Sequence, residues 1–333
     1  MREHPQFEPS SEQLSHWPEG VSGSERNGRG ESEVRRPLPI LWHPPGMSPF
    51  DDVQAWFWEQ GVRIPAVQER RAHRTEVLAR EPAPIAAERV ERTPAENAEE
   101  IRRQALACGA DLVGIVAPHP EWVFEGYEFD YPWIVMLGVA MDYEVLRKAP
   151  EPEASLTVID GYTRGWEVGQ PLADHIRGLG WDAKASGGPS AGPILLVPAA
   201  LEAGFGELGK HGSIINRELG SNFRLAAVFT DLPLEPDAPV DIASEDFCQS
   251  CRICVDACPP GAISHEKQLV RGVEKWYVDF DLCAPFFLET YGCGVCLAAC
   301  PWSAPGRGPR ISEKMLARRE RDAQRAAAEN SGP

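Results

Sequence analysis

Cysteine placement is the feature that most restricts this chain of 333 residues. Eight of its nine cysteines fall between positions 248 and 300, in two runs that each end in Cys-Pro. The first run has three cysteines at x2 spacing and a fourth after x3, and comprises Cys248, Cys251, Cys254 and Cys258. The second comprises Cys283, Cys293, Cys296 and Cys300. Because the first spacing is that of bacterial ferredoxins, the runs predict two [4Fe–4S] clusters and one-electron chemistry.

A ligand rule divides these thiols between the two clusters. In two-cluster ferredoxins the fourth cysteine of a run binds the other run's cluster. The rule therefore assigns one cluster to Cys248, Cys251, Cys254 and Cys300. It assigns the second to Cys258, Cys283, Cys293 and Cys296. This crossover requires the two runs to pack side by side, and Pro259 and Pro301 turn the chain away after the last ligand of each run.

Zinc binding and disulfide bonding are the alternative uses of such cysteines. Zinc sites rarely repeat three cysteines at x2 spacing followed by x3 and Cys-Pro. A long chain without a signal peptide and with bunched cysteines argues against a disulfide framework. Cys108 stands outside the runs and follows Ile101 and Ala105 at helical spacing, so it is predicted to pack in a hydrophobic core.

Composition narrows the class of protein. The length suits about two domains with extensions, and a hydrophobic content of 43% supports an ordinary core. The formal net charge of -17, from 33 basic and 50 acidic residues, argues against a nucleic-acid partner. No apolar run reaches the ~18 residues of a membrane span, and no apolar segment follows Arg35-Arg36 as an export signal would require. We therefore expect a cytoplasmic location, where thiolates stay reduced.

The chain divides into five predicted segments. Residues 1–37 are polar and expected to be disordered, and residues 38–92 are expected to wrap the core. Residues 93–240 form the main domain, residues 241–309 the cluster module, and residues 310–333 a tail that forms a surface helix.

Helix and strand signals alternate in the main domain. The residues Thr93-Pro94-Ala95-Glu96 form a capping box with proline at the first helical position. They predict a helix that runs to Cys108 and is stopped by Gly109. Further helices are expected at 163–178 and 199–203, and strands at 111–117, 133–141 and 224–230. The alternation predicts the α/β class.

Three glycines imitate a dinucleotide-binding fingerprint. Gly204, Gly206 and Gly209 match GxGxxG, and Asp231 follows 22 residues later. In a dinucleotide fold, however, the glycines directly follow a strand and open a helix. Here a helical segment lies between the strand and the glycines, so we expect a loop whose backbone approaches a large flat ligand.

Read together, these motifs resemble the corrinoid iron–sulfur reductive dehalogenases, in a superfamily that includes epoxyqueuosine reductase. The resemblance covers roughly residues 93–305. It rests on the Cys-Pro runs and on a series of upstream motifs: Gly161-Tyr162, Gly180, Ala203-Gly204-Phe205-Gly206-Glu207, Phe223-Arg224-Leu225, Thr230-Asp231-Leu232-Pro233-Leu234 and Phe247-Cys248. It implies a nitroreductase-like α/β core that holds base-off cobalamin, and a ferredoxin module whose clusters pass electrons to cobalt. The absence of an Asp-x-His-x-x-Gly run agrees with base-off binding.

The resemblance also implies roles for particular residues. Tyr162 aligns with the proton donor, and Arg224, 62 residues later, with the basic residue beside it. A guanidinium near a phenol favours the phenolate and so eases release of the proton, and arginine stays charged. The expected corrinoid contacts are Gly204, Gly206, Gly209, Lys210 and His211.

These residues predict a cobalamin-dependent reductive dehalogenase acting on a small organohalide. The loop 184–192 lacks the asparagine with which some family members contact the halogen, which leaves the substrate open. We expect a separate electron donor, such as a ferredoxin or flavodoxin, and neither a nucleic-acid partner nor a membrane span. An epoxyqueuosine reductase is one alternative, although residues 191–203 lack that family's aspartate donor. A plain iron–sulfur electron carrier is the other.

Overall fold

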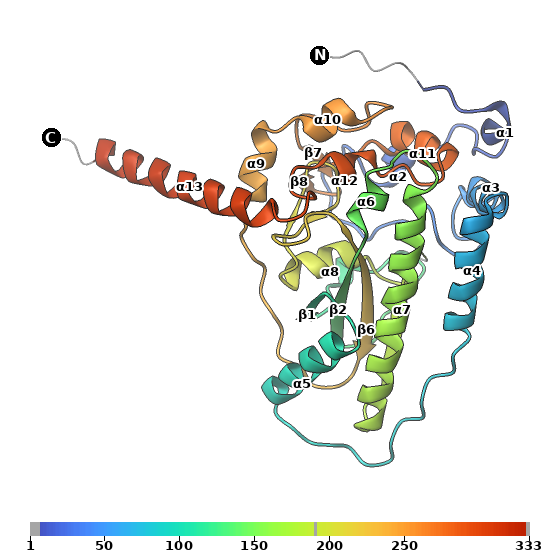
Figure 1. Cartoon of the computed structure of the whole chain (residues 1–333), viewed down its shortest axis with the longest axis vertical. Helices are drawn as coiled ribbons and strands as arrows, with labels where there is room; N and C mark the ends of the chain where they lie inside the picture. The colour runs from blue at the N-terminus through green and yellow to red at the C-terminus, as the bar shows by residue number, and fades with distance from the viewer. Residues whose placement is uncertain (1–6, 190–191, 331–333) are drawn as a thin grey trace.

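The computed structural model describes residues 7–189 and 192–330 (Figure 1). Its centre is a four-stranded sheet in the order β1-β2-β6-β3, formed by β1 Leu112–Val116, β2 Trp133–Ala140, β6 Phe223–Thr230 and β3 Ala183–Gly187. All three pairings are antiparallel. The predicted α/β class, which implies parallel strands, is therefore corrected to a mixed helix-and-sheet fold with an antiparallel sheet. Parallel neighbours need a helical crossover, and only the short 3-10 helix η1 Pro120–Trp122 lies between β1 and β2.

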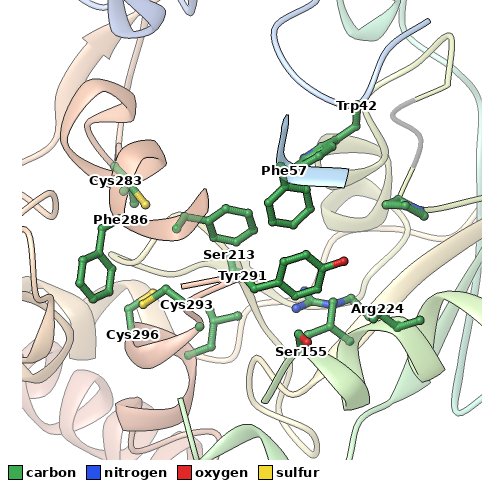
Figure 2. A pocket seen from close by; sticks show the side chains of 18 of the residues that line it. Trp42, Phe57, Ser155, Ser213, Arg224, Cys283, Phe286, Tyr291, Cys293 and Cys296 are labelled. Atoms are coloured by element: carbon green, nitrogen blue, oxygen red, sulfur yellow. The ribbon is translucent and has the colours of Figure 1, made fainter. Parts of the chain in front are cut away.

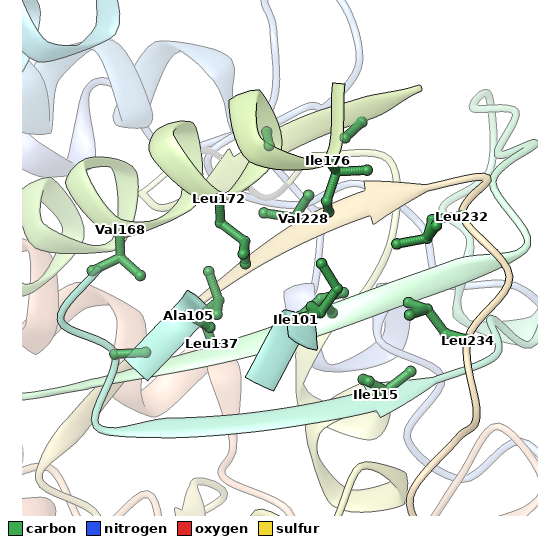
Figure 3. Close-up of a cluster of buried hydrophobic side chains, with 14 of the residues drawn as sticks. Ile101, Ala105, Ile115, Leu137, Val168, Leu172, Ile176, Val228, Leu232 and Leu234 are labelled. Carbon is green, nitrogen blue, oxygen red and sulfur yellow. The ribbon is translucent and has the colours of Figure 1, made fainter. Parts of the chain in front are cut away.

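Helices cover both faces of this sheet. Successive residues of a strand point to opposite faces, so Val135 and Leu137 of β2 pack under α5 Pro94–Ala107 and α7 Ala154–Gly178 (Figure 3). Ile134 and Met136 pack on the other face, with α8 Leu196–Glu202. Each such side chain contributes about 1.5–3 kcal/mol when it is fully buried. The central strands are thus apolar on both faces, which explains their continuous hydrophobic sequences.

The predicted boundaries of α5 are confirmed. Thr93 and Glu96 form the capping box, Cys108 is the C-cap, and Gly109 follows with φ of 100°. Cys108 packs against the core as expected.

Helix α7 begins at Ala154, well before the predicted residue 163, so Tyr162 lies inside a helix. The helix propensity of this segment is low because it contains Gly161, Gly165 and Gly169, and glycine is a poor helix former. A Cβ atom at Gly161 would lie 3.0 Å from Arg224 Cγ, and one at Gly165 would lie 2.9 Å from Ala226 Cβ. The glycines therefore follow the helical repeat and let α7 approach β6 closely.

The N-terminal segment is ordered from residue 7, although its composition predicts disorder. It contains α1 Ser11–Leu14 and α2 Gly23–Arg26. Helix α2 lies against α11 Phe280–Glu289, and Gln13 of α1 donates a hydrogen bond to the Pro285 carbonyl of α11. The Asp281 carboxylate accepts hydrogen bonds from Ser22 Oγ at 2.6 Å and from the backbone N–H of Gly23 at 2.7 Å. The polar residues of this segment thus bind the cluster module, and residues 1–6 lie outside the described residues. The next segment wraps the core as predicted, because α3 Asp51–Val62 is followed by α4 Pro65–Leu78, which runs along α7 (Figure 1).

The remaining elements are short, except for the last helix. They are α6 Tyr143–Leu146, β4 Glu207–Leu208, β5 Ile214–Ile215, α9 Ser244–Ser250, α10 Ile253–Ala257, β7 Gln268–Val270, β8 Val273–Lys275, α12 Val295–Ala299 and α13 Gly308–Asn330. Figure 1 shows α13 projecting from the body beside α9. Among the described residues, no helix combines the length and the apolar character needed to cross a membrane.

Candidate functional site

The eight clustered thiols form two sets in space. A small hollow is lined by Cys248, Cys251, Cys254 and Cys300, here named the Cys248 set. A much larger cavity is lined by Cys258, Cys283, Cys293 and Cys296, named the Cys258 set. The structure therefore brings together the residues that the crossover rule groups, and their roles as ligands stay a prediction.

Two packed helices produce this crossover. Helices α10 and α12 lie against each other. Cys258 is the C-cap residue of α10 and Cys300 is the C-cap residue of α12. Each run thus delivers its last cysteine at a helix end, beside the other run.

Burial keeps these thiols protonated when nothing positive binds them. Burial, together with a smaller effect of the neighbouring thiols, raises the pKa of Cys248, Cys254 and Cys283 to about 12. Metal binding requires the thiolate. Among the described residues, no group of three potential ligands is placed to share one metal ion. The Cys248 set lines a small hollow, and the Cys258 set lines one side of the larger cavity. Four thiols around a hollow fit an iron–sulfur cluster, because each thiolate binds a different iron atom.

The larger cavity has a volume of about 340 Å³ and mainly apolar walls. Aromatic side chains from the N-terminal region and from the cluster module enclose it, among them Trp42, Phe57, Trp58 and Tyr291. Figure 2 shows the thiols of Cys283, Cys293 and Cys296 on one side of the cavity and Arg224 on the other. Small-molecule and cofactor sites have this character, with apolar walls and a few placed polar groups.

Tyr162 and Arg224 meet in this cavity. Both line it, and the Arg224 guanidinium carbon lies 5.6 Å from the centroid of the Tyr162 ring. The cation therefore lies over the ring and is attracted to its face. Arg224 Nε is buried and has no hydrogen-bond partner among the described residues. A buried polar group without a partner is costly, so this guanidinium is suited to a ligand in the cavity.

Arg74 of α4 is a cavity residue that the sequence did not reveal. Its Nη2 donates to the Gly188 carbonyl at 3.1 Å, and its Nε is buried without a partner among the described residues. Burial lowers the pKa of Arg74, and the nearby Tyr162 opposes that shift. The neighbouring Arg71 lies over the Trp58 ring, 4.8 Å from its centroid. In the sequence, Arg71 and Arg74 are marked only by their helical spacing, and their segment contains none of the motifs.

The predicted corrinoid loop lies mostly elsewhere. Gly204 packs on the Ala238 carbonyl and Gly206 on the Ile215 carbonyl, and neither these glycines nor Gly209 is among the residues that line the larger cavity. At each glycine, protein backbone or side chains occupy the space that a side chain would fill, and contact of these glycines with a corrinoid stays a prediction. The same holds for Lys210, which lines the hollow of the Cys248 set.

Lys210 and His211 are buried beside that hollow. Lys210 is 2% exposed, donates from Nζ to the Cys251 carbonyl at 3.0 Å, and lies 4.7 Å from the Trp276 ring centroid. Burial lowers the pKa of His211 to about 4, which keeps the imidazole neutral. His211 lines both the hollow and the larger cavity. Of the five predicted corrinoid contacts, His211 is therefore the one that the structure brings to the cavity.

Comparison with known proteins identifies an iron–sulfur domain and two kinds of relative. Residues 247–304 match the 4Fe-4S dicluster domain. Over 209 residues the chain is 34% identical to the tetrachloroethene reductive dehalogenase of Desulfitobacterium hafniense, an alignment that covers 59% of this chain and 37% of that protein. Over 259 residues it is 31% identical to the epoxyqueuosine reductase of Salmonella typhimurium, covering 62% of this chain and 64% of that protein. The chain is therefore similar to both reductive dehalogenases and epoxyqueuosine reductases, and it contains a 4Fe-4S dicluster domain.

A solved structure of one such relative has a similar fold over most of this chain. It is a reductive dehalogenase, described as suggesting a mechanism for B12-dependent dehalogenation, and it matches with a TM-score of 0.67 and 26% identity. The match covers 74% of this chain and 39% of that one. The chain spans only 37% of the dehalogenase from D. hafniense and 64% of the reductase from S. typhimurium. The mixed helix-and-sheet core with an iron–sulfur dicluster domain is thus a shared arrangement within larger relatives.

Proposed function

We propose that this protein is a cytoplasmic, cobalamin-dependent reductive dehalogenase. In this reaction an organohalide takes up two electrons and one proton, and the carbon–halogen bond is replaced by a carbon–hydrogen bond as halide leaves. The observation that carries the proposal is that the Cys258 set and the Tyr162–Arg224 pair line one cavity. An electron entry point and a proton donor therefore face the same space.

The larger cavity is suited to a corrinoid. Its walls are mainly apolar, as a flat macrocycle requires, and Arg71, Arg74 and Arg224 supply cations for polar substituents. A second cavity of about 570 Å³ shares Trp42, Trp58, Arg71, Arg74 and Pro189 with the first, which extends the available space. When bound, cobalamin would supply a cobalt ion that the clusters could reduce to a low-valent state able to break a carbon–halogen bond. We assign it to a nitroreductase-like core formed by residues 93–240 together with the cluster module.

Tyr162 then supplies the proton. Its ring lies beneath the Arg224 guanidinium in the contact described above. The positive charges of Arg224 and Arg74 stabilise the phenolate that remains after the proton has left. The mainly apolar walls lower the local dielectric constant, which strengthens these charge interactions. An aromatic organohalide suits such walls, and a related solved structure is a catabolic reductive dehalogenase in complex with 3-bromo-4-hydroxybenzoic acid.

The decisive experiment uses protein produced anaerobically with vitamin B12. We expect about eight iron atoms and one cobalt atom per chain, and halide release from halophenols and 3-bromo-4-hydroxybenzoate with reduced viologen as electron source. Zinc in place of iron would refute the cluster assignment. Bound corrinoid without halide release across the panel would refute the substrate class, and iron without any cobalt would leave a plain electron carrier.

An epoxyqueuosine reductase is the second candidate, favoured by the similarity to the enzyme of S. typhimurium. The two candidates differ in substrate but share the requirement for electrons and a proton. Complementation of a strain that lacks queuosine distinguishes them. Restored queuosine in tRNA would favour the second candidate, and halide release without complementation would favour the first.

Gly188 offers a test of how Tyr162 is positioned. A Cβ atom there would overlap the Tyr162 ring, so Gly188→Ala must displace the phenol. We expect halide release to fall by about 10- to 100-fold, since small misplacements of a reacting group cost this much. Gly178→Ala is the matched control, because nothing lies within 4 Å of its added Cβ. Unchanged turnover in Gly188→Ala at full cobalt content would contradict the assigned position of Tyr162.

A further inference from the structure

A surface groove of about 610 Å³ lies between α9, α10 and the first half of α13. Phe247 and Pro301 form part of its wall, and the same two residues line the hollow of the Cys248 set. Phe247 also packs in one hydrophobic cluster with Cys248 and Cys300. The groove and the thiols of the Cys248 set are therefore separated by single side chains.

The rim of the groove on α13 is strongly basic. Its cations recur at intervals of three or four residues, which places them on one side of the helix: Arg307, Arg310, Lys314, Arg318 and Arg321. Within the described part of the chain, only Arg318 of these five forms an ion pair, with Asp322 at 3.6 Å. In a chain of net charge -17, this is a local concentration of unpaired positive charge.

Different contacts hold α13 to the body and leave that stripe outside. Arg319 pairs with both Asp241 and Asp246. Ser312 Oγ donates to the Ile242 carbonyl at 2.9 Å, and Ile311 packs in the hydrophobic cluster that contains Cys248. The basic residues are therefore not needed to attach the helix.

The floor of the groove is apolar. Phe247, Pro301, Ile311 and Met315 line it, and Ile253, which is 45% exposed, adds a further hydrophobic side chain. Apolar centres with charged rims are typical of protein–protein interfaces. A groove of this composition suits a folded protein with an acidic surface around an apolar contact.

We propose that this groove is the docking surface for an acidic one-electron carrier protein of the flavodoxin or ferredoxin class. The inference rests on the proposed function, in which electrons must reach the Cys258 set from outside. The Cys248 set lies next to the groove and the Cys258 set next to the larger cavity, so an electron delivered here crosses the two sets in order. In each transfer the carrier is oxidised by one electron and one cluster is reduced by one electron.

Charge complementarity favours an acidic partner, and the position of the groove favours a protein carrier over a nucleic acid. Opposite charges on two proteins steer their encounter and raise the association rate by roughly 10- to 1,000-fold. A nucleic acid would also be attracted to the stripe. An electron carrier must bind beside a thiol set to transfer an electron, as it would in this groove, whereas a nucleic acid has no such requirement.

The test is stopped-flow reduction of the complete protein by flavodoxin hydroquinone. One-electron transfer produces the blue flavodoxin semiquinone, which absorbs apart from the iron–sulfur chromophore. In the double variant Lys314→Glu/Arg321→Glu we expect the second-order rate constant to fall at least about tenfold. We expect the wild-type rate to fall with added salt and the variant to lose that dependence. Reduction by dithionite or viologen should not change, because these small molecules need no docking surface.

The matched control is Arg92→Glu/Lys184→Glu, which lowers the net charge by the same amount. Both control positions are exposed and lie outside the groove, one just before α5 and the other on β3. Equal slowing in both double variants would overturn the proposal, since net charge alone would then explain it. A groove variant that lost RNA binding but kept the flavodoxin rate would also overturn it, in favour of a nucleic-acid partner. Normal reduction kinetics in protein that releases no halide would support the groove and refute only the substrate.

Discussion

Tyr162→Phe is expected to lower halide release about 1,000-fold while both iron and cobalt remain bound. General acid catalysis by a positioned side chain contributes about 100- to 10,000-fold, and phenylalanine keeps the ring while removing the acidic hydroxyl. The cation contact with Arg224, 5.6 Å from the ring centroid, can persist in the variant. Steady-state halide release and the visible spectra of the same preparation provide the measurement.

Tyr291→Phe is the matched control for this experiment. Tyr291 lines the same cavity but stacks on Phe57, with ring centroids 4.7 Å apart, and its hydroxyl binds Arg71. We expect its loss to lower turnover much less than the loss of the Tyr162 hydroxyl, because a hydrogen bond to a charged group such as Arg71 contributes about 1.5–3 kcal/mol and the Tyr291 hydroxyl gives no proton to the substrate. Retention of more than a tenth of the activity in Tyr162→Phe, or an equal loss in both variants, would remove Tyr162 from the role of proton donor.

The sequence predicted those parts of the molecule that depend on local chemistry. The start of α5 follows from side-chain and backbone groups three residues apart, as Thr93 and Glu96 show. The buried strands β2 and β6 follow from their apolar runs. The grouping of the thiols rests on a rule about cluster geometry, and the structure brings the same residues together.

What the sequence missed depends on contacts between distant segments. Residues 1–37 look disordered because they are polar, yet several of those that the structure describes have partners more than 250 positions away, as in the bond from Ser22 to Asp281. Helix α7 starts earlier than predicted because glycines that disfavour a free helix are required where it meets β6. Arg74 could not be identified as a cavity residue, because only the packing of α4 on α7 brings it to Gly188.

The same packing explains how Tyr162 and Arg224 meet. They lie 62 residues apart, on a helix and on a strand. Gly161 lets the helix backbone approach the Arg224 side chain, because a Cβ atom at this glycine would lie only 3.0 Å from Arg224 Cγ. The contact between Tyr162 and Arg224 therefore depends on Gly161, which has no side chain. The resemblance to a family pointed to this pair, whereas local sequence patterns did not.

Cys258→Ala is expected to remove the cluster beside the larger cavity, although its three nearest cysteines in the sequence belong to the other set. Iron should fall from about eight to about four atoms per chain, and halide release should fall by at least about 1,000-fold because electrons no longer reach the cavity. Cys300→Ala should instead remove the cluster beside the groove on α13. In that variant dithionite still reduces the remaining cluster, while reduction by flavodoxin is lost.

Iron analysis and electron paramagnetic resonance of the reduced proteins separate these outcomes, because the two clusters interact magnetically when both are present. Cys108→Ala is the control, since Cys108 packs against the core of the main domain and should leave the iron content unchanged. If Cys258→Ala and Cys248→Ala removed the same cluster, the runs would bind without crossing. The Cys258 set would then no longer hold one cluster, and the route from the groove through both sets to Tyr162 would lose its basis.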